Sequence, residues 1–194
     1  MGDAKRRRER EAAEALTLSP ERRLLRRAAN VLHDGFIAPN RLAGACHYTA
    51  FGLHHYLATQ HGLTVPVHVG FVRYDDVAWA THSWLELEGR KTDLAIHYPN
   101  APALPGPMLI DGEVVARGQT VCFYALIPDD GAPTAIAMST GSVAGERRAR
   151  EHQYFTDLAR QSDLAAIEQY LAGDPSSLYD KLQAVWVGFI PDKA

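Results

Sequence analysis

The chain has 194 residues, a formal net charge of -3 and a pI near 6.3, with 46% hydrophobic and 22% charged residues. This length fits one compact domain, and the composition disfavours a disordered, fibrous or membrane-spanning protein. A charge this close to zero also disfavours a general nucleic-acid-binding protein, because such proteins carry a broad excess of Lys and Arg. Since there are only two cysteines and no apolar signal-like segment near the start, we expect a cytoplasmic protein without a disulfide framework.

Basic residues are concentrated in the first thirty positions, at Lys5–Arg10 and Arg22–Arg27, with glutamates among them. This pattern predicts a charged, solvated helix over residues 4–16, in which opposite charges lie about one turn apart. Contact with a nucleic acid or a membrane surface is the alternative interpretation. We therefore expect residues 1–18 to form a helical extension and residues 19–194 to form a single domain.

The next predicted elements are helices separated by a loop. Ser19–Pro20 places a good N-cap residue before a proline at the first helical position, which predicts a helix that ends near Leu32. Residues 33–44 contain Gly, Pro and Asn without an apolar period and are predicted to be a loop. That loop leads into a helix from Cys46 to about Gln60, where apolar residues recur at helical spacing and Gly62 provides a stop.

A β-sheet is predicted after this helix. Alternating apolar residues predict a strand at 67–71, followed by a hairpin with strands 81–88 and 91–96 around a Gly89–Arg90 turn. Two more strands, 108–115 and 120–127, are predicted to form a hairpin through Arg117–Gly118 and to extend the same sheet. The predicted elements then end with a short strand at 134–138, a helix at 145–171 and an apolar segment at 178–190.

Three residues of these elements form a candidate thiol site. A thiol becomes a good nucleophile at a helix N-terminus beside an imidazolium, because both favour its charged form. Cys46 is the first residue of a predicted helix, and His82 lies near the start of a predicted strand. Asp93 lies on the next strand, where its carboxylate could accept a hydrogen bond from the histidine ring. With a turn at Gly89–Arg90, His82 and Asp93 are not cross-strand neighbours, so we expect a wider loop or a bulge.

The order Cys46, then His82-Ser83-Trp84-Leu85-Glu86-Leu87-Glu88-Gly89, then Asp93 resembles the transglutaminase-like cysteine protein superfamily, including the leader-peptide proteases of lasso-peptide biosynthesis. The resemblance covers about residues 40–96. It implies an α+β fold with a papain-like core, in which the helix bearing Cys46 packs on an antiparallel sheet carrying His82 and Asp93. It also implies acyl transfer through a thioester, without a metal or organic cofactor.

We therefore expect a thiol-dependent hydrolase or acyltransferase that acts on an amide or ester bond through a Cys-His-Asp triad, in the first place a peptidase or amidase. Its expected substrates are peptides, proteins or small amides, and neither a membrane nor a nucleic acid is an expected partner. Transfer of the acyl group to an amine is a second enzymatic interpretation. The alternative from another class is a catalytically inert binding or scaffolding module that retains the fold and binds its partner through the charged N-terminal helix.

Other residues are candidates for supporting roles. Asn40 stands six residues before Cys46, where papain-like enzymes place a Gln that donates to the oxyanion; the alternative is a turn or cap residue. Trp84 and His97 are candidates for the wall of the site, although Trp84 also fits as a core aromatic residue. Cys122 lies in an apolar strand and is predicted to be a core residue. The histidines at 47, 54, 55, 61 and 68 lack the H-E-x-x-H pattern, so no metal site is predicted.

Overall fold

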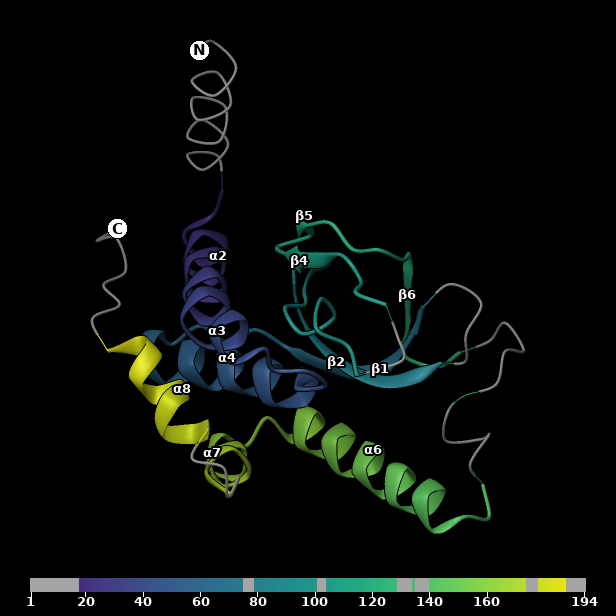
Figure 1. Cartoon of the computed structure of the whole chain (residues 1–194). Helices are drawn as coiled ribbons and strands as arrows, with labels where there is room; N and C mark the ends of the chain where they lie inside the picture. The colour runs from purple at the N-terminus through teal and green to yellow at the C-terminus, as the bar shows by residue number, and fades with distance from the viewer. Residues whose placement is uncertain are drawn as a thin grey trace.

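The computed structural model describes residues 18–74, 79–100, 104–128, 134, 140–173 and 178–187. The charged helix predicted at 4–16 and most of the strand predicted at 134–138 lie outside the described residues. The described part has an α+β architecture, in which helices pack around an antiparallel sheet (Figure 1). Among the residues that the structure describes, none of the helices has the length and apolar character that crossing a bilayer requires.

The chain runs from helices through strands and back to helices. The helical segments are α2 (Pro20–Leu32), the π-helical turn η1 (His33–Ile37), α3 (Ala38–Asn40), α4 (Cys46–His61), α6 (Val143–Gln161), α7 (Leu164–Ala172) and α8 (Leu178–Trp186). The strands are β1 (Val67–Tyr74), β2 (Ala80–Leu87), β3 (Arg90–Thr92), β4 (Met108–Ile110), β5 (Glu113–Ala116) and β6 (Cys122–Ala125). A four-stranded sheet has the order β3-β2-β1-β6, and β4 and β5 form a separate two-stranded sheet.

Helix α2 begins and ends where the sequence predicts, and the Ser19 hydroxyl accepts from the Arg22 N–H at its start. The loop predicted over residues 33–44 is wrong in its first part, because η1 and α3 continue the helix as far as Asn40. Burial explains the difference: Phe36 and Ile37 are fully buried, and packing of apolar side chains outweighs the weak helix preference of Gly and Pro. The chain leaves the helix at Arg41, where φ is 45°.

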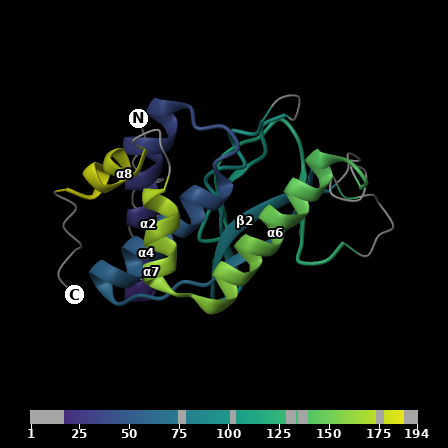
Figure 2. The same ribbon diagram turned by 90° about the horizontal axis from the view of Figure 1, so that it is seen from below.

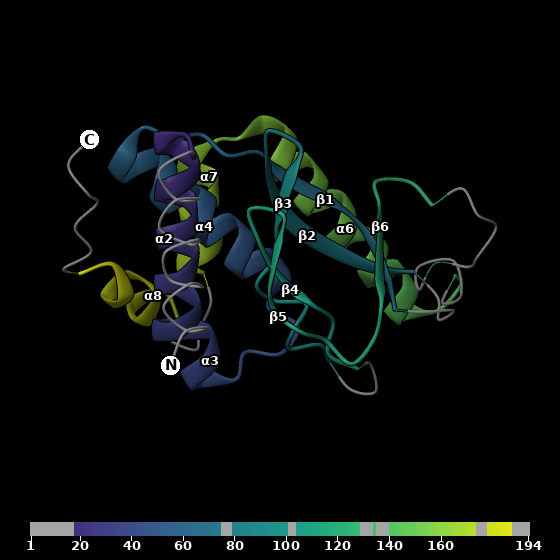
Figure 3. The ribbon, with the colours of Figure 1, turned by 90° about the horizontal axis from the view of Figure 1, so that it is seen from above.

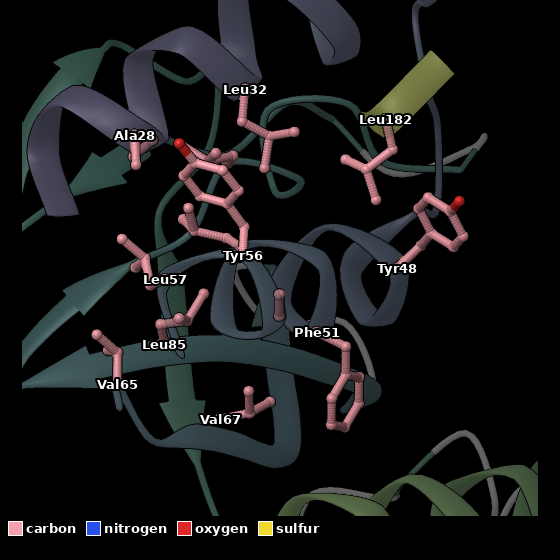
Figure 4. Packing of buried hydrophobic residues seen from close by; sticks show 14 of the residues in the cluster. Ala28, Leu32, Tyr48, Phe51, Tyr56, Leu57, Val65, Val67, Leu85 and Leu182 are labelled. Atoms are coloured by element: carbon pink, nitrogen blue, oxygen red, sulfur yellow. The ribbon is translucent and has the colours of Figure 1, made fainter. Parts of the chain in front are cut away.

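Helix α4 is the centre of the fold. It begins at Cys46, as predicted, and ends at Gly62, whose φ of 66° suits a glycine cap. Most of its residues are buried on every side, because α2, α7 and the sheet all pack against it. Figure 4 shows Leu57 pointing from α4 toward Leu85 of β2, while Tyr48 points away from the sheet toward Leu182 of α8. Of the helices that the structure describes, the one that begins with Cys46 is thus the most enclosed.

The two faces of the main sheet have different neighbours. The register pairs Val69 with Ser83 and Gly70 with His82, so side chains alternate between faces as the sequence predicts. One face is covered by α4 and α6, and Figure 2 shows α6 crossing it. This face carries Val67, Val69, Phe71, Ser83 and Leu85. The other face, hereafter the inner face, carries His82, Trp84, Cys122 and Tyr124.

The β2–β3 hairpin differs from its prediction by one residue. Its two-residue turn is Glu88–Gly89, with φ of 52° and 74°, rather than Gly89–Arg90. Leu85 then pairs with Thr92, and the same register makes Asp93 a diagonal neighbour of His82 on one face. The expected wider loop or bulge is therefore not needed, because the shift of the turn alone brings the two residues together.

Strand β3 ends at Thr92 and does not reach residue 96 as predicted. The backbone of Asp93 turns instead to Leu109 of β4, where each residue donates an N–H to the carbonyl of the other at 2.8 and 3.0 Å. The edge of β2 at His82 and Ser83 is consequently not paired with β3. This unpaired edge lies where α4 begins, as the contact between His47 and Ser83 shows.

The hairpin predicted through Arg117–Gly118 is wrong. Strands β4 and β5 pair around Asp111–Gly112, where φ is 53° and 76°, an Asp-Gly pair typical of a tight hairpin turn. Asp111 is fully buried and accepts two hydrogen bonds from the Arg22 guanidinium, at 2.8 and 3.0 Å. That ion pair joins the hairpin to α2.

Strand β6 extends the main sheet as predicted, by pairing with β1 (Figure 3). The prediction that residues 108–115 extend the same sheet is wrong, because β4 pairs with β5 in a separate sheet. Gly70 of β1 allows β6 to come close, because a Cβ there would lie 2.5 Å from the Ala125 carbonyl oxygen and 3.1 Å from Trp84. The sheet as a whole is curled. As a result, side chains from its two ends meet over the inner face.

The single helix predicted at 145–171 is two helices. Helix α6 ends at Ser162, with φ of 50°, and Asp163 caps α7 by accepting from the N–H groups of Ala165 and Ala166. The apolar segment predicted after residue 178 contains helix α8. Its residues Leu182 and Trp186 are buried in the core beside α4.

Candidate active site

His82 and Asp93 form a buried hydrogen-bonded pair on the inner face. The His82 Nε2–H donates to Asp93 Oδ2 at 2.6 Å, and the two side chains are 5% and 1% exposed. A carboxylate in this position holds the ring orientation and favours the tautomer that carries a proton on Nε2. The other ring nitrogen, Nδ1, is left for a second partner.

Cys46 is the neighbour of the ring on this side, close enough for its charge to raise the pKa of His82. Cys46 is a free, buried cysteine at the first position of α4. Its N-cap residue, Ala45, makes no side-chain hydrogen bond to the first turn, so the helix N-terminus keeps its positive partial charge for a nearby anion. The structure thus brings Cys46, His82 and Asp93 together in the order that the sequence predicts.

The charges around His82 favour its protonated form. Burial alone would lower the pKa of this ring, but the negative charges of Asp93 and Cys46 and hydrogen bonds to both outweigh burial and raise the pKa to about 10. An imidazolium between a carboxylate and a thiol sulfur is the arrangement that an activated cysteine needs.

Asp93 has a full set of donors in addition to His82. Its Oδ1 accepts from the N–H groups of Ala95 and Ile96, both at 3.2 Å, and its Oδ2 also accepts from the Tyr124 hydroxyl at 2.7 Å. Four donors on one buried carboxylate stabilise its charged form. They also restrict its rotation, so its orientation toward His82 is determined by the local backbone and by β6.

Tyr124 is a site residue that the sequence reasoning missed. Its ring packs edge-on against His82 and Trp84, with centroid distances of 6.2 and 5.2 Å. Burial and the neighbouring Asp93 carboxylate raise the pKa of the Tyr124 hydroxyl far above its usual range, so it remains a donor. Only the alternation of β6 could have suggested it, since Tyr124 shares a face with Cys122.

Tyr74 and Cys122 also border the site. They are paired across β1 and β6. Burial, followed by the charges of Asp93, Cys122 and Cys46, raises the pKa of Tyr74, which places this hydroxyl within electrostatic range of the nucleophile candidate. Cys122 is half-buried rather than a core residue, because β6 is an edge strand.

Trp84 lies beside the histidine on the inner face, and its role as a site wall stays a prediction. It is 3% exposed, stacks on His68 and packs against Tyr124 on the same face as His82. Its Nε1–H is directed at Glu86, with a long separation of 3.4 Å. Trp84 and Tyr124 together shield the imidazole–carboxylate pair from water on this side.

Asn40 and His97 make their hydrogen bonds elsewhere. The Asn40 side-chain amide donates to the Phe36 carbonyl at 2.7 Å, which matches the cap alternative. The His97 Nδ1 lies 3.0 Å from the Gly106 carbonyl oxygen, and its ring packs edge-on against Tyr98. Within the described part of the chain, these contacts join both residues to neighbouring segments rather than to Cys46, and their site roles stay predictions.

Comparison with known proteins gives no relative: no family model, no curated protein and no solved structure matches this chain. A functional assignment therefore depends on the geometry of the site.

Proposed function

We propose that this protein is a thiol-dependent hydrolase or acyltransferase that acts on an amide or ester bond, in the first place a peptidase or amidase. The observation that carries the proposal is the chain of contacts from Cys46, at a helix N-terminus, through the buried His82 ring to Asp93. The arrangement supports a papain-like, transglutaminase-like core as the finer description of the α+β fold. Its helix begins with the nucleophile, and its antiparallel sheet carries the base.

In the proposed reaction, the Cys46 thiolate attacks the carbonyl carbon of the substrate, and the carbonyl electron pair moves to oxygen. The backbone N–H of Cys46 is positioned at the helix N-terminus to donate to that oxyanion. The intermediate then collapses: the bond to the leaving group breaks, and His82 transfers its proton to the departing amine or alcohol. A thioester remains on Cys46.

The second half of the reaction reverses these roles. Neutral His82 removes a proton from water as the water oxygen attacks the thioester carbonyl. The C–S bond then breaks, the carboxylic acid is released, and Cys46 leaves as a thiolate beside the protonated His82 ring. An amine in place of water would give an amide, which is acyl transfer. Asp93 stabilises the charged ring in both halves.

The first test measures alkylation of Cys46 by iodoacetamide between pH 5 and pH 10, with mass spectrometry of the peptides that contain Cys46 and Cys122. We expect Cys46 to react at pH 6, where an ordinary thiol is almost fully protonated, and His82→Ala to abolish that reaction at low pH. Cys122 in the same sample provides the internal reference. Equal pH profiles for wild type and His82→Ala would contradict the proposal and favour the inert module.

The second test measures turnover of the activated ester p-nitrophenyl acetate. A burst of p-nitrophenol equal to the enzyme concentration, absent in Cys46→Ala and present in Cys122→Ala, is the expected result for an acyl-enzyme on Cys46. Adding a primary amine distinguishes the two reaction types. Formation of the N-substituted acetamide would indicate acyl transfer, whereas unchanged release of acetate would indicate hydrolysis.

A further inference from the structure

The residues that follow Cys46 and His82 in the sequence are themselves in contact. The Nδ1 of His47, the second residue of α4, lies 2.6 Å from the Ser83 hydroxyl oxygen of β2. Consecutive residues of a strand point to opposite faces, so Ser83 faces α4 while His82 faces the inner side. One short hydrogen bond thus joins the helix that carries the nucleophile to the strand that carries the base, one residue along the chain from Cys46 and from His82.

The His47 ring is enclosed in a way that suits a fixed position. It stacks on Phe155 of α6, with ring centroids 3.8 Å apart and planes at 14°. Ser83 is 1% exposed. Burial, followed by the charges of His82 and His152, lowers the pKa of His47 to about 3, so the ring is neutral over the physiological range. A neutral ring cannot supply the imidazolium that pairs with a thiolate, which leaves that role to His82.

The alignment of Cys46 with His82 requires a directional contact between α4 and β2. Cys46 and His82 belong to different elements, and the strand edge beside His82 is not paired with β3. Packing of apolar side chains resists separation of α4 from β2 but opposes sliding and rotation only weakly, since it is non-directional. A hydrogen bond has a preferred direction and length, and a displacement of about 1 Å at a reacting group lowers a rate by about 100-fold.

We propose that His47 and Ser83 are a positioning pair that holds the first turn of α4 against β2, so that the Cys46 sulfur stays in register with the His82 ring. This inference rests on the proposed function, because the pair acts only through Cys46 and His82. The His47 ring also stacks on Phe155, so the pair is in contact with α6, which covers this face of the sheet.

The test uses the full-length chain and the variants Ser83→Ala, His47→Phe and the double variant. Ser83→Ala removes the hydroxyl with little change in volume, and His47→Phe keeps a ring that can stack on Phe155 while it removes the hydrogen bond. For each protein, the iodoacetamide profile of Cys46 and the rate of the p-nitrophenol burst are measured, together with the midpoint of urea unfolding. Tyr48→Phe is the matched control, since it removes a buried hydroxyl of α4 that points to Leu171, away from the site.

The expected result is a loss of about 10-fold or more in burst rate and in Cys46 alkylation at pH 6 for each single variant, with little further loss in the double variant. Tyr48→Phe should lower the urea midpoint without changing either reactivity. Folded Ser83→Ala and His47→Phe proteins with a wild-type alkylation profile would overturn the positioning role. Failure of the proposed function is distinguishable, because the wild-type profile itself would then be independent of His82.

If His47→Phe fails to fold, Ser83→Ala alone decides the question, and Ser83→Thr provides the rescue, since it restores the hydroxyl. Recovery of Cys46 reactivity in Ser83→Thr would support the hydrogen bond as the cause. Equal reactivity of folded Ser83→Ala and wild type would again reject the proposal.

Discussion

The hydroxyl of Tyr124 donates to Asp93 Oδ2 at 2.7 Å, although the two residues lie at opposite ends of the four-stranded sheet. Tyr124 belongs to the edge strand β6, and Asp93 directly follows the edge strand β3. The sheet is curled enough for the two side chains to meet over its inner face, and Gly70 lets β6 come close to β1. The curled sheet therefore determines the environment of the carboxylate that orients His82.

Removal of this hydroxyl by Tyr124→Phe should lower both stability and reactivity. A hydrogen bond to a charged group contributes roughly 1.5–3 kcal/mol, so we expect the free energy of unfolding in urea to fall by about that amount. The Asp93 carboxylate would also lose one of the four donors that restrict its rotation, and the p-nitrophenol burst should slow. An unchanged unfolding free energy would show that the hydroxyl contributes nothing to holding the sheet curled.

Asp93→Asn should show how much the negative charge of Asp93 contributes to reactivity, apart from the space that its side chain fills. The amide can occupy the place of the carboxylate, but it removes the negative charge that favours the His82 imidazolium. We expect the burst rate to fall by about 100-fold or more, a loss in the range that proper acid–base function contributes. Asp163→Asn, which changes an exposed carboxylate that also accepts from two backbone N–H groups at the start of α7, is the control and should react as wild type does.

The charge on His82 can be measured by NMR of its ring nitrogens. With a pKa of about 10, the ring should be doubly protonated at pH 8. Cys46→Ala should lower that pKa, because the thiolate charge is among the causes that raise it. A ring that is neutral at pH 8 in wild type would contradict the proposed ion pair.

The same pKa has a consequence for stability. His82 has its ordinary pKa near 6.5 in the unfolded chain and about 10 in the folded protein, so the folded state binds more protons between these values. The stabilisation from His82 is fully present below about pH 6.5 and is lost as the pH rises through 10. Urea unfolding at pH 6, 8 and 10 should show this decline, and His82→Gln should flatten it.

His47 should give the opposite dependence at acid pH. Its pKa is about 3 in the folded protein and near 6.5 in the unfolded chain, so the unfolded state binds more protons between these values. Stability from the neutral ring is present above about pH 6.5 and falls as the pH drops toward 3. A comparison of wild type with His47→Phe from pH 4 to pH 7 isolates this contribution, and parallel curves would show that His47 titrates normally.

The ion pair between Arg22 and Asp111 should contribute to the stability of the fold and not to the reactivity of Cys46. Arg22→Met would leave a fully buried carboxylate without its main partner, which costs about 3 kcal/mol in the unfolding free energy. Arg150→Met is the control, because its pair with Glu146 is exposed on both sides and does not involve Asp111. We expect a loss of about 1 kcal/mol or less. A similar loss in both variants would mean that burial does not distinguish the pairs.

Local sequence was enough to predict several parts of the site. Ser19 and Pro20 indicate the start of α2, Gly62 indicates the end of α4, and apolar spacing places Cys46 at a helix start. Alternation along β2 correctly assigns His82 and Trp84 to one face. These features depend on interactions within a few residues, such as helix capping and side-chain periodicity, which the sequence carries directly.

Other parts were decided by contacts between distant segments. The turn at Glu88–Gly89, and not one residue later, places Asp93 diagonally to His82. The Asp111–Gly112 turn directs β4 toward β5, so that β6 is free to pair with β1. Tyr124 and Ser83 have no local signal of their roles, because each acts on a residue at least 31 positions away.

The sequence by itself thus determined which residue types were available for thiol chemistry, their order along the chain, and the helix that Cys46 opens. The tertiary structure decided which of them meet, through the curl of the sheet, the early end of β3 and the bond from His47 to Ser83. The physical reason is that capping and periodicity act over one or two helical turns, whereas strand pairing and buried hydrogen bonds join segments whose proximity exists only after the core has formed.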